Sequence, residues 1–330
     1  MNLVTFVRKS AIAALSLLCL SALQTHSADA AVEAAFMSSG SDFADSADYA
    51  QTDLANEGIA LYDEGVALER EGTPASLRAA AEKYTEAAAI FKAENLLPQE
   101  AITLHRLGHA YSELDAHKEA LDTFKTALTM WQQIGDEESV LELQEDVTFS
   151  SLDLGISLEE SGSEVEVGIA IIQYERAIDL VPGDANRANR AWLWRQRGHA
   201  YQKLGNTQEA IDSFDESLEL WRSVGDAENE KVLLEIKVAT IYNWGISMQR
   251  ERTPESLQKA LALYNEALPM LSGGEIPDLE AQILHMIGHV QEELGNSAAA
   301  RDAYLQSLEM WRALNNSEQV SAIEEDLERF

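Results

Sequence analysis

The sequence is poor in cysteine, in proline and in basic residues. Its one cysteine, Cys19, excludes an intramolecular disulfide and a zinc site made of cysteines. The 6 prolines and 18 glycines in 330 residues exclude collagen-like and proline-rich chains. Only 24 basic residues stand against 57 acidic ones, which gives a formal net charge of −33. Nucleic acids and anionic lipids are therefore excluded as the main ligands, because each requires a basic surface.

Long apolar runs are also missing, apart from one near the start of the chain. The run from Ala11 to Leu23 is shorter than the roughly 20 residues that a membrane span needs. It follows Arg8 and Lys9 and precedes the small-residue site Ala28-Asp29-Ala30. This order predicts a secretory signal peptide over residues 1–30, cleaved after Ala30. An uncleaved membrane anchor is the alternative.

The residues that follow the expected cleavage site are small, polar and acidic. Residues 31–53 cannot bury enough apolar surface to fold, so we expect a disordered acidic spacer there. The mature chain is expected to have no transmembrane helix. Export to a bacterial periplasm is the favoured location, with secretion or a thylakoid lumen as alternatives.

A period of 90 residues governs the rest of the chain. Three sets of residues recur at this spacing: Gly65, Gly155 and Gly245; Gly108, Gly198 and Gly288; and Trp131, Trp221 and Trp311. Such self-similarity is typical of repeat architectures. It predicts three double repeats, at about residues 54–146, 147–236 and 237–330.

Each double repeat divides into two helix pairs. In the second half of the first repeat, Leu104, Gly108 and Tyr111 share one helical face, and Ala120 and Phe124 follow on the next helix. We expect Gly108 and Ala120 to allow close approach of the two helices, with the ring of Phe124 filling the space beyond them.

Three additional residues lengthen the turn in the first pair of each repeat. There, Thr73-Pro74 and Thr253-Pro254 predict a helix cap followed by a proline in the first turn. Gly205 and Gly295 are expected to end the first helix of two later pairs.

These offsets resemble those of the tetratricopeptide repeat family. The second repeat carries the family's apolar, glycine, tyrosine, alanine and aromatic positions at Trp194, Gly198, Tyr201, Leu204, Gly205, Ala210 and Phe214. The resemblance covers about residues 54–330 and is nearest to the long-helix variety found in kinesin light chain and bacterial repeat scaffolds. It implies an all-α fold, a right-handed α-solenoid of six helix–turn–helix pairs. Residues 317–330 are expected to form a C-terminal capping helix.

The resemblance also implies a concave groove that binds a partner polypeptide. In the family, a stripe beside the packing face of each first helix lines this groove. The resemblance therefore implies that the following residues line the groove: Tyr62, His105, His109, Trp192, Arg195, His199, Tyr242, His285 and His289. Trp192 is the strongest candidate for an anchor, because tryptophan is enriched at binding hot spots. The strongly acidic composition favours a cationic or mixed-charge partner.

The recurring histidines have a second interpretation, since His105/His109 and His285/His289 have the i, i+4 spacing of metal ligands. Arg195 replaces the corresponding histidine of the middle repeat, and the glutamate of a zinc-protease helix is absent. We therefore assign no metal ligand and no cofactor from the sequence. Tolerated surface residues of shared ancestry remain an alternative for these histidines.

The sequence gives no indication of catalysis, because it has no glycine-rich phosphate loop and no nucleophile elbow. We expect an exported, non-catalytic scaffold or assembly factor, monomeric, that binds a protein or peptide in its groove. The alternative function is binding of a metal ion or small ligand by the histidine stripe.

Overall fold

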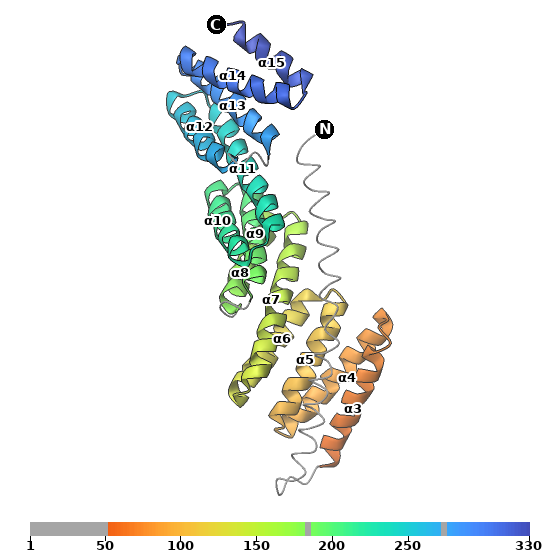
Figure 1. Ribbon diagram of the computed structural model, residues 1–330. Coiled ribbons are helices and arrows are strands. Elements are labelled where there is room, and N and C mark those ends of the chain that lie inside the picture. The colour runs from red at the N-terminus through yellow and green to blue at the C-terminus, as the bar shows by residue number, and fades with distance from the viewer. Residues whose placement is uncertain (1–51, 182–185, 272–275) are drawn as a thin grey trace. The chain divides into compact units, whose positions relative to one another are not determined.

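The computed structural model describes residues 52–181, 186–271 and 276–330. The expected signal peptide and nearly all of the expected spacer lie outside these residues. Within them the chain forms thirteen α-helices, one short 3-10 helix and no strand (Figure 1). This confirms the prediction of an all-α chain. Among the described helices, none combines the length and the apolar character that a membrane crossing requires.

The chain divides into two compact units, one ending at Asp146 and the other running from Val147 to Phe330. The first contains α3 (Asp53–Glu69), α4 (Pro74–Ala93), α5 (Leu97–Glu113) and α6 (His117–Ile134). The division falls within α7 (Glu137–Glu160). The second unit continues with α8 (Glu164–Leu180), α9 (Arg187–Lys203), α10 (Thr207–Val224), α11 (Ala227–Arg250), α12 (Pro254–Ala267), η1 (Leu268–Leu271), α13 (Pro277–Glu293), α14 (Ser297–Ala313) and α15 (Ser317–Leu327).

The helices α3 to α14 form the six predicted pairs, and α15 follows the last pair. In the first unit α3 packs against α4, α4 against α5 and α5 against α6, and successive helices from α8 to α15 pack in the same way in the second unit. Helix α15 buries Ile323 in a cluster with Tyr304 and Trp311 of α14. This contact covers the apolar face of the last pair, as expected for a capping helix.

A glycine and an aromatic ring meet in every pair. A Cβ atom at Gly108 would lie 2.4 Å from Cε1 of Phe124, and one at Gly198 would lie 2.3 Å from Cε1 of Phe214. The same contact joins Gly65 to Tyr84, Gly155 to Tyr174, Gly245 to Tyr264 and Gly288 to Tyr304. All six rings are buried. The predicted close approach of the paired helices is therefore confirmed.

The predicted helix caps are present. The hydroxyl of Thr73 accepts a hydrogen bond from the backbone N–H of Ser76 at 3.1 Å, and Ser76 Oγ accepts one from the N–H of Thr73. Thr253 and Ser256 repeat this capping box at the start of α12. Each box satisfies two backbone donors that a helix start otherwise leaves unpaired.

Positive φ angles end the first helices of several pairs. Gly205 after α9 has a φ of 76° and Gly295 after α13 has a φ of 80°, as the sequence predicts. Asp115 takes the corresponding place after α5 with a φ of 56°. Aspartate tolerates this left-handed conformation better than most residues, so the turn is kept without glycine.

The recurring tryptophans pack inside the repeat. Trp131, Trp221 and Trp311 are all buried. Trp221 shares a cluster with Leu233 and Ile236 of α11, the first helix of the next pair. Trp221 therefore joins its pair to the next pair, and Trp311 joins the last pair to α15.

Candidate functional site

The nine predicted groove residues all lie on the first helix of a pair. Tyr62 is on α3, and Tyr242 is on α11. The remaining seven residues lie on three helices: His105 and His109 on α5; Trp192, Arg195 and His199 on α9; and His285 and His289 on α13. Tyr62, His105 and Arg195 are buried, whereas the other six are half-buried. Groove contact by these residues stays a prediction.

Three of these residues form a row along α9, called the α9 row below. The guanidinium of Arg195 lies over the ring of Trp192, 4.8 Å from its centroid. Arg195 Nε donates to His199 Nε2 at 3.5 Å, and His199 Nδ1 lies 3.0 Å from Gln202 Oε1. The Trp192 ring also packs edge-on against Trp221. The α9 row therefore holds a fixed positive charge between two aromatic groups.

Burial sets the charge states in the α9 row. It lowers the pKa of Arg195 to about 10, so the guanidinium stays charged at neutral pH. Burial, followed by the positive charge of Arg195, lowers the pKa of His199 to about 4. The imidazole of His199 is therefore neutral at physiological pH.

The two tyrosines lie against the ring of their own helix pair. Tyr62 packs on Tyr84 with ring centroids 5.7 Å apart, and Tyr242 packs on Tyr264 at 6.0 Å. Burial raises the pKa of Tyr62 and of Tyr242 above the ordinary value for a phenol. Both hydroxyls therefore stay protonated at physiological pH.

The histidine pair on α5 meets an aspartate of α7, and we call this group the first cluster. His105 Nε2 lies 2.7 Å from Asp146 Oδ2 and 3.1 Å from His109 Nε2. His109 Nε2 lies 3.7 Å from the same carboxylate oxygen. Both rings pack against the edge of Phe124. Two ring nitrogens and one carboxylate oxygen thus converge on one point.

The histidine pair on α13 meets an aspartate of α15 in the same way, and this group is the second cluster. Asp326 Oδ2 lies 2.7 Å from His285 Nε2 and 3.5 Å from His289 Nε2. The other carboxylate oxygen, Asp326 Oδ1, pairs with Arg329 at 2.9 Å. Burial, followed by the charge of His285, lowers the pKa of His289.

The two aspartates were not predicted from the sequence, although a signal was present. Each follows the first histidine of its cluster by 41 residues. At the equivalent point of the middle repeat stands Ile236, in the repeat where Arg195 replaces histidine. The sequence argument against metal binding assumed that all three repeats must supply a histidine pair, and Arg195 breaks that series. In the structure each ligand set is complete within one unit, so a histidine pair in the middle repeat is not required.

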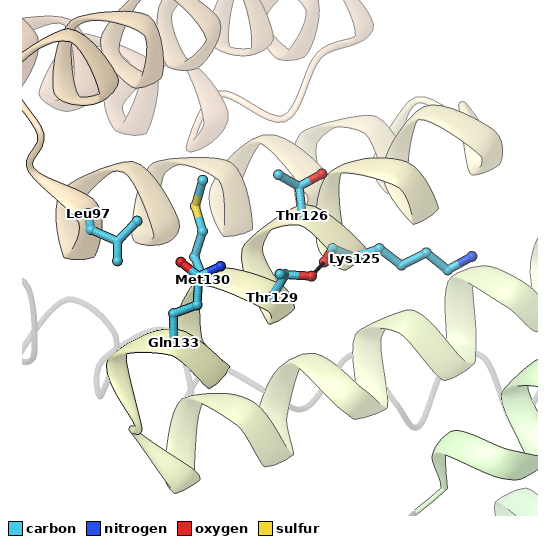
Figure 2. Close-up of a pocket in the computed structure, with 6 residues that line it drawn as sticks. All are labelled: Leu97, Lys125, Thr126, Thr129, Met130 and Gln133. Atoms are coloured by element: carbon cyan, nitrogen blue, oxygen red, sulfur yellow. Dashed lines mark hydrogen bonds between the residues drawn. The ribbon is translucent and has the colours of Figure 1, made fainter.

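A shallow pocket lies elsewhere in the first unit. It has a volume of about 380 Å³ and is formed by Leu97 at the start of α5 and by Lys125, Thr126, Thr129, Met130 and Gln133 of α6 (Figure 2). A smaller pocket of about 150 Å³ lies beside Lys237 and Asp215 in the second unit. Neither pocket is lined by a predicted groove residue.

Family models of the tetratricopeptide repeat match three segments of the chain, residues 101–130, 191–223 and 281–310. Each matched segment lies in the second helix pair of one double repeat, and together the three share the 90-residue period. The comparison with curated proteins finds no match.

Solved structures of low sequence identity also resemble the chain. A tetratricopeptide repeat protein from Bacteroides fragilis is 20% identical, with a TM-score of 0.41, and the match covers 70% of this chain and 99% of that one. BtubC from P. vanneervenii is 15% identical, with a TM-score of 0.35 and coverages of 80% and 93%. Kinesin light chain-like repeats from Podosopora anserina are 13% identical, with a TM-score of 0.31 and coverages of 65% and 96%.

The repeat assignment rests on the family matches and on the helix pairs together. The three matched segments coincide with α5/α6, α9/α10 and α13/α14, and the intervening pairs carry the same glycine–ring contact. The chain therefore contains tetratricopeptide repeats, matched at residues 101–130, 191–223 and 281–310.

Proposed function

We propose that this chain is an exported, non-catalytic scaffold or assembly factor that binds a partner polypeptide. The observation that carries the proposal is the recurrence of tetratricopeptide repeats in all three double repeats, because such repeats are protein-binding modules. Export is supported by the sequence of residues 1–30 alone. A bacterial periplasm is the location that we favour.

The α9 row is the surface that we propose for partner contact. Trp192 and His199 are half-buried, and both contact the Arg195 side chain. Aromatic groups set among polar ones are typical of specific binding surfaces. The net charge of −33 favours a cationic or mixed-charge segment. Metal binding by the histidine clusters does not compete with this proposal, because neither cluster includes a residue of α9.

A capture experiment with matched variants tests the proposal. The purified protein, a Trp192→Ala/His199→Ala variant and a Thr126→Ala/Met130→Ala control are each incubated with the extracytoplasmic fraction of the source organism. We expect one polypeptide to bind the protein and the control but not the α9 variant. Added salt should weaken its capture, since screening reduces attraction between opposite charges. Equal capture by all three proteins, or capture by none, would contradict the proposal.

Export is tested separately by sequencing the N-terminus of the protein isolated from its source. We expect the mature chain to begin at Ala31 and to be found outside the cytoplasm. A chain that retains Met1 would contradict cleavage, and the cytoplasmic fraction would contradict export.

A further inference from the structure

We propose that each histidine–aspartate cluster binds one divalent transition-metal ion of the zinc class, so that one chain holds two ions. The first site comprises His105, His109 and Asp146, and the second comprises His285, His289 and Asp326. The inference goes beyond the scaffold function and does not depend on the α9 row.

The geometry of the first cluster fits such an ion. Its three ligand atoms are separated by 2.7, 3.1 and 3.7 Å. Atoms at these separations lie on a circle of radius about 1.9 Å, so a point slightly outside their plane is about 2.0–2.1 Å from all three, the length of zinc bonds to histidine and carboxylate. The ligand atoms of the second cluster also lie within 4.8 Å of one another.

Three polar atoms of the first cluster face one another at short range. An ionised carboxylate only accepts hydrogen bonds, so a proton on His105 Nε2 accounts for the 2.7 Å contact with Asp146. His109 Nε2 lies 3.1 Å from His105 Nε2 and 3.7 Å from the same carboxylate oxygen. A cation at the centre of the three atoms attracts all of them at once.

Neighbouring side chains hydrogen-bond to the second cluster and orient its ligand atoms, as they do around metal sites. The Tyr304 hydroxyl donates to Glu292 Oε2 at 2.9 Å and lies 2.9 Å from His289 Nδ1. Because its single proton is used on Glu292, its oxygen accepts from His289 Nδ1–H. His289 Nε2 therefore carries the lone pair, and it faces Asp326 Oδ2. Such outer hydrogen bonds orient metal-binding histidines and carboxylates in proteins, and Arg329 does the same for Asp326 Oδ1.

The middle repeat supplies an internal comparison. Of the three ligand positions only His199 is kept, while Arg195 and Ile236 replace the other histidine and the aspartate. Arg195 also places a fixed positive charge 3.5 Å from His199 Nε2. Two of the three ligand positions are thus lost together in the middle repeat, which matches a shared ligand better than three independent surface residues.

The ligand set indicates the class of metal. Two imidazoles and one carboxylate suit zinc and its first-row neighbours better than calcium or magnesium, which prefer oxygen ligands. Three protein ligands leave a fourth position for water or for a partner's side chain. The side chain of His109 is 40% exposed and that of His289 is 29% exposed, so solvent reaches both sites.

Metal counting tests the proposal directly. The purified protein is stripped with a chelator and titrated with Zn²⁺ in competition with a coloured chelator. Cobalt absorption reports the coordination geometry in a parallel titration. We expect two Zn²⁺ per chain, one for Asp146→Asn or Asp326→Asn, and none for the double variant. His199→Gln is the matched control, a histidine of the same repeat position outside both clusters, and it should keep two.

The folding of each variant is checked by circular dichroism without metal. His109→Gln provides a second test of the first site, since this partly exposed side chain can be replaced with little effect on folding. Failure of the folded native protein to take up Zn²⁺ in this competition would overturn the proposal. Undiminished binding by the folded double asparagine variant would overturn it as well.

Discussion

At the scale of single residues, the contact between glycine and an aromatic ring sets how closely paired helices approach. The ring of Phe124 is 1% exposed and lies where a Cβ of residue 108 would stand. A buried ring in a packed interior moves only at a cost, since protein interiors hold few voids. The same logic applies to all six pairs, because each has a glycine facing a buried ring.

Gly108→Ala is therefore expected to destabilise the protein. The added methyl would lie 2.4 Å from Phe124 Cε1, and overpacking of this kind costs about 1–3 kcal/mol. Gly168→Ala is the matched control, a glycine inside α8 whose Cβ position has no atom within 4 Å apart from its chain neighbours and the nearby backbone of α8. It should raise stability by up to about 1 kcal/mol, through helix propensity alone. Urea unfolding measures both variants, and midpoints that shift in the same direction would contradict this account.

His199 is expected to stay neutral down to low pH. Burial and the charge of Arg195, with a smaller effect of Lys203, lower its pKa to about 4, although the hydrogen bond to Gln202 acts in the opposite direction. The folded state thus favours the neutral ring. Its contribution to stability is present above the unfolded value near 6.5 and is lost as the pH falls towards 4.

Nuclear magnetic resonance of the imidazole protons measures this titration. Arg195→Gln removes the neighbouring charge and should raise the midpoint of His199 towards the ordinary value. A midpoint near 6.5 in the native protein would be incompatible with the geometry of the α9 row.

At the scale of helices, two caps explain where α4 and α12 begin. Thr73 and Thr253 each precede a proline and exchange hydrogen bonds with the serine three residues later. The proline has no N–H to leave unpaired and is already close to the helical φ angle. These local signals lie within a few residues of each other, so they can be recognised in the sequence.

Thr253→Ala is expected to lower the stability of the second unit by about 0.5–2 kcal/mol, because the N–H of Ser256 loses its acceptor. Thr85→Ala is the control, since this exposed hydroxyl only bonds back to the carbonyl of Ala81 within α4. It should be neutral or slightly stabilising, as alanine has the higher helix propensity. Thermal unfolding compares the two, and equal losses would contradict the capping role.

The helix pairs could be predicted because their signals are local and recur three times. Gly108 and Phe124 are 16 residues apart, and the same pattern returns 90 residues later at Gly198 and Phe214. The clusters could not be predicted in the same way. Asp146 of α7 contacts His105 of α5 across a separation of 41 residues that includes the whole of α6. Among 57 acidic residues, nothing local marks this one.

At the scale of the whole molecule, charge is the dominant property. A net charge of −33 attracts cations of every size, and it keeps the chain soluble through self-repulsion. Such a field strengthens capture of a cationic polypeptide and of divalent metal ions alike, whereas salt screens its long-range part. The field alone specifies neither ligand, and we propose that the α9 row and the two clusters provide the specificity.

The internal repetition predicts that a third metal site can be built in the middle repeat. Arg195→His together with Ile236→Asp restores both missing ligand positions beside His199. We expect the folded double variant to bind three Zn²⁺ per chain, whereas Arg195→His alone should bind two. Thermal unfolding with and without Zn²⁺ shows that the variant is folded. At a free ion concentration of 100 times the dissociation constant, each added site contributes about 2.7 kcal/mol. A folded double variant that binds only two ions would contradict the repeat alignment.

The central claim is that the α9 row is the surface through which this repeat protein contacts its partner. Photo-cross-linking in the source organism tests it most directly, with a benzophenone amino acid placed at Trp192 or, as a control, at Met130 in the pocket of α6. Both positions are half-buried, so they offer comparable access. The account predicts a single cross-linked polypeptide from position 192 and none from position 130. Cross-links from position 130 alone, or from neither position, would contradict it.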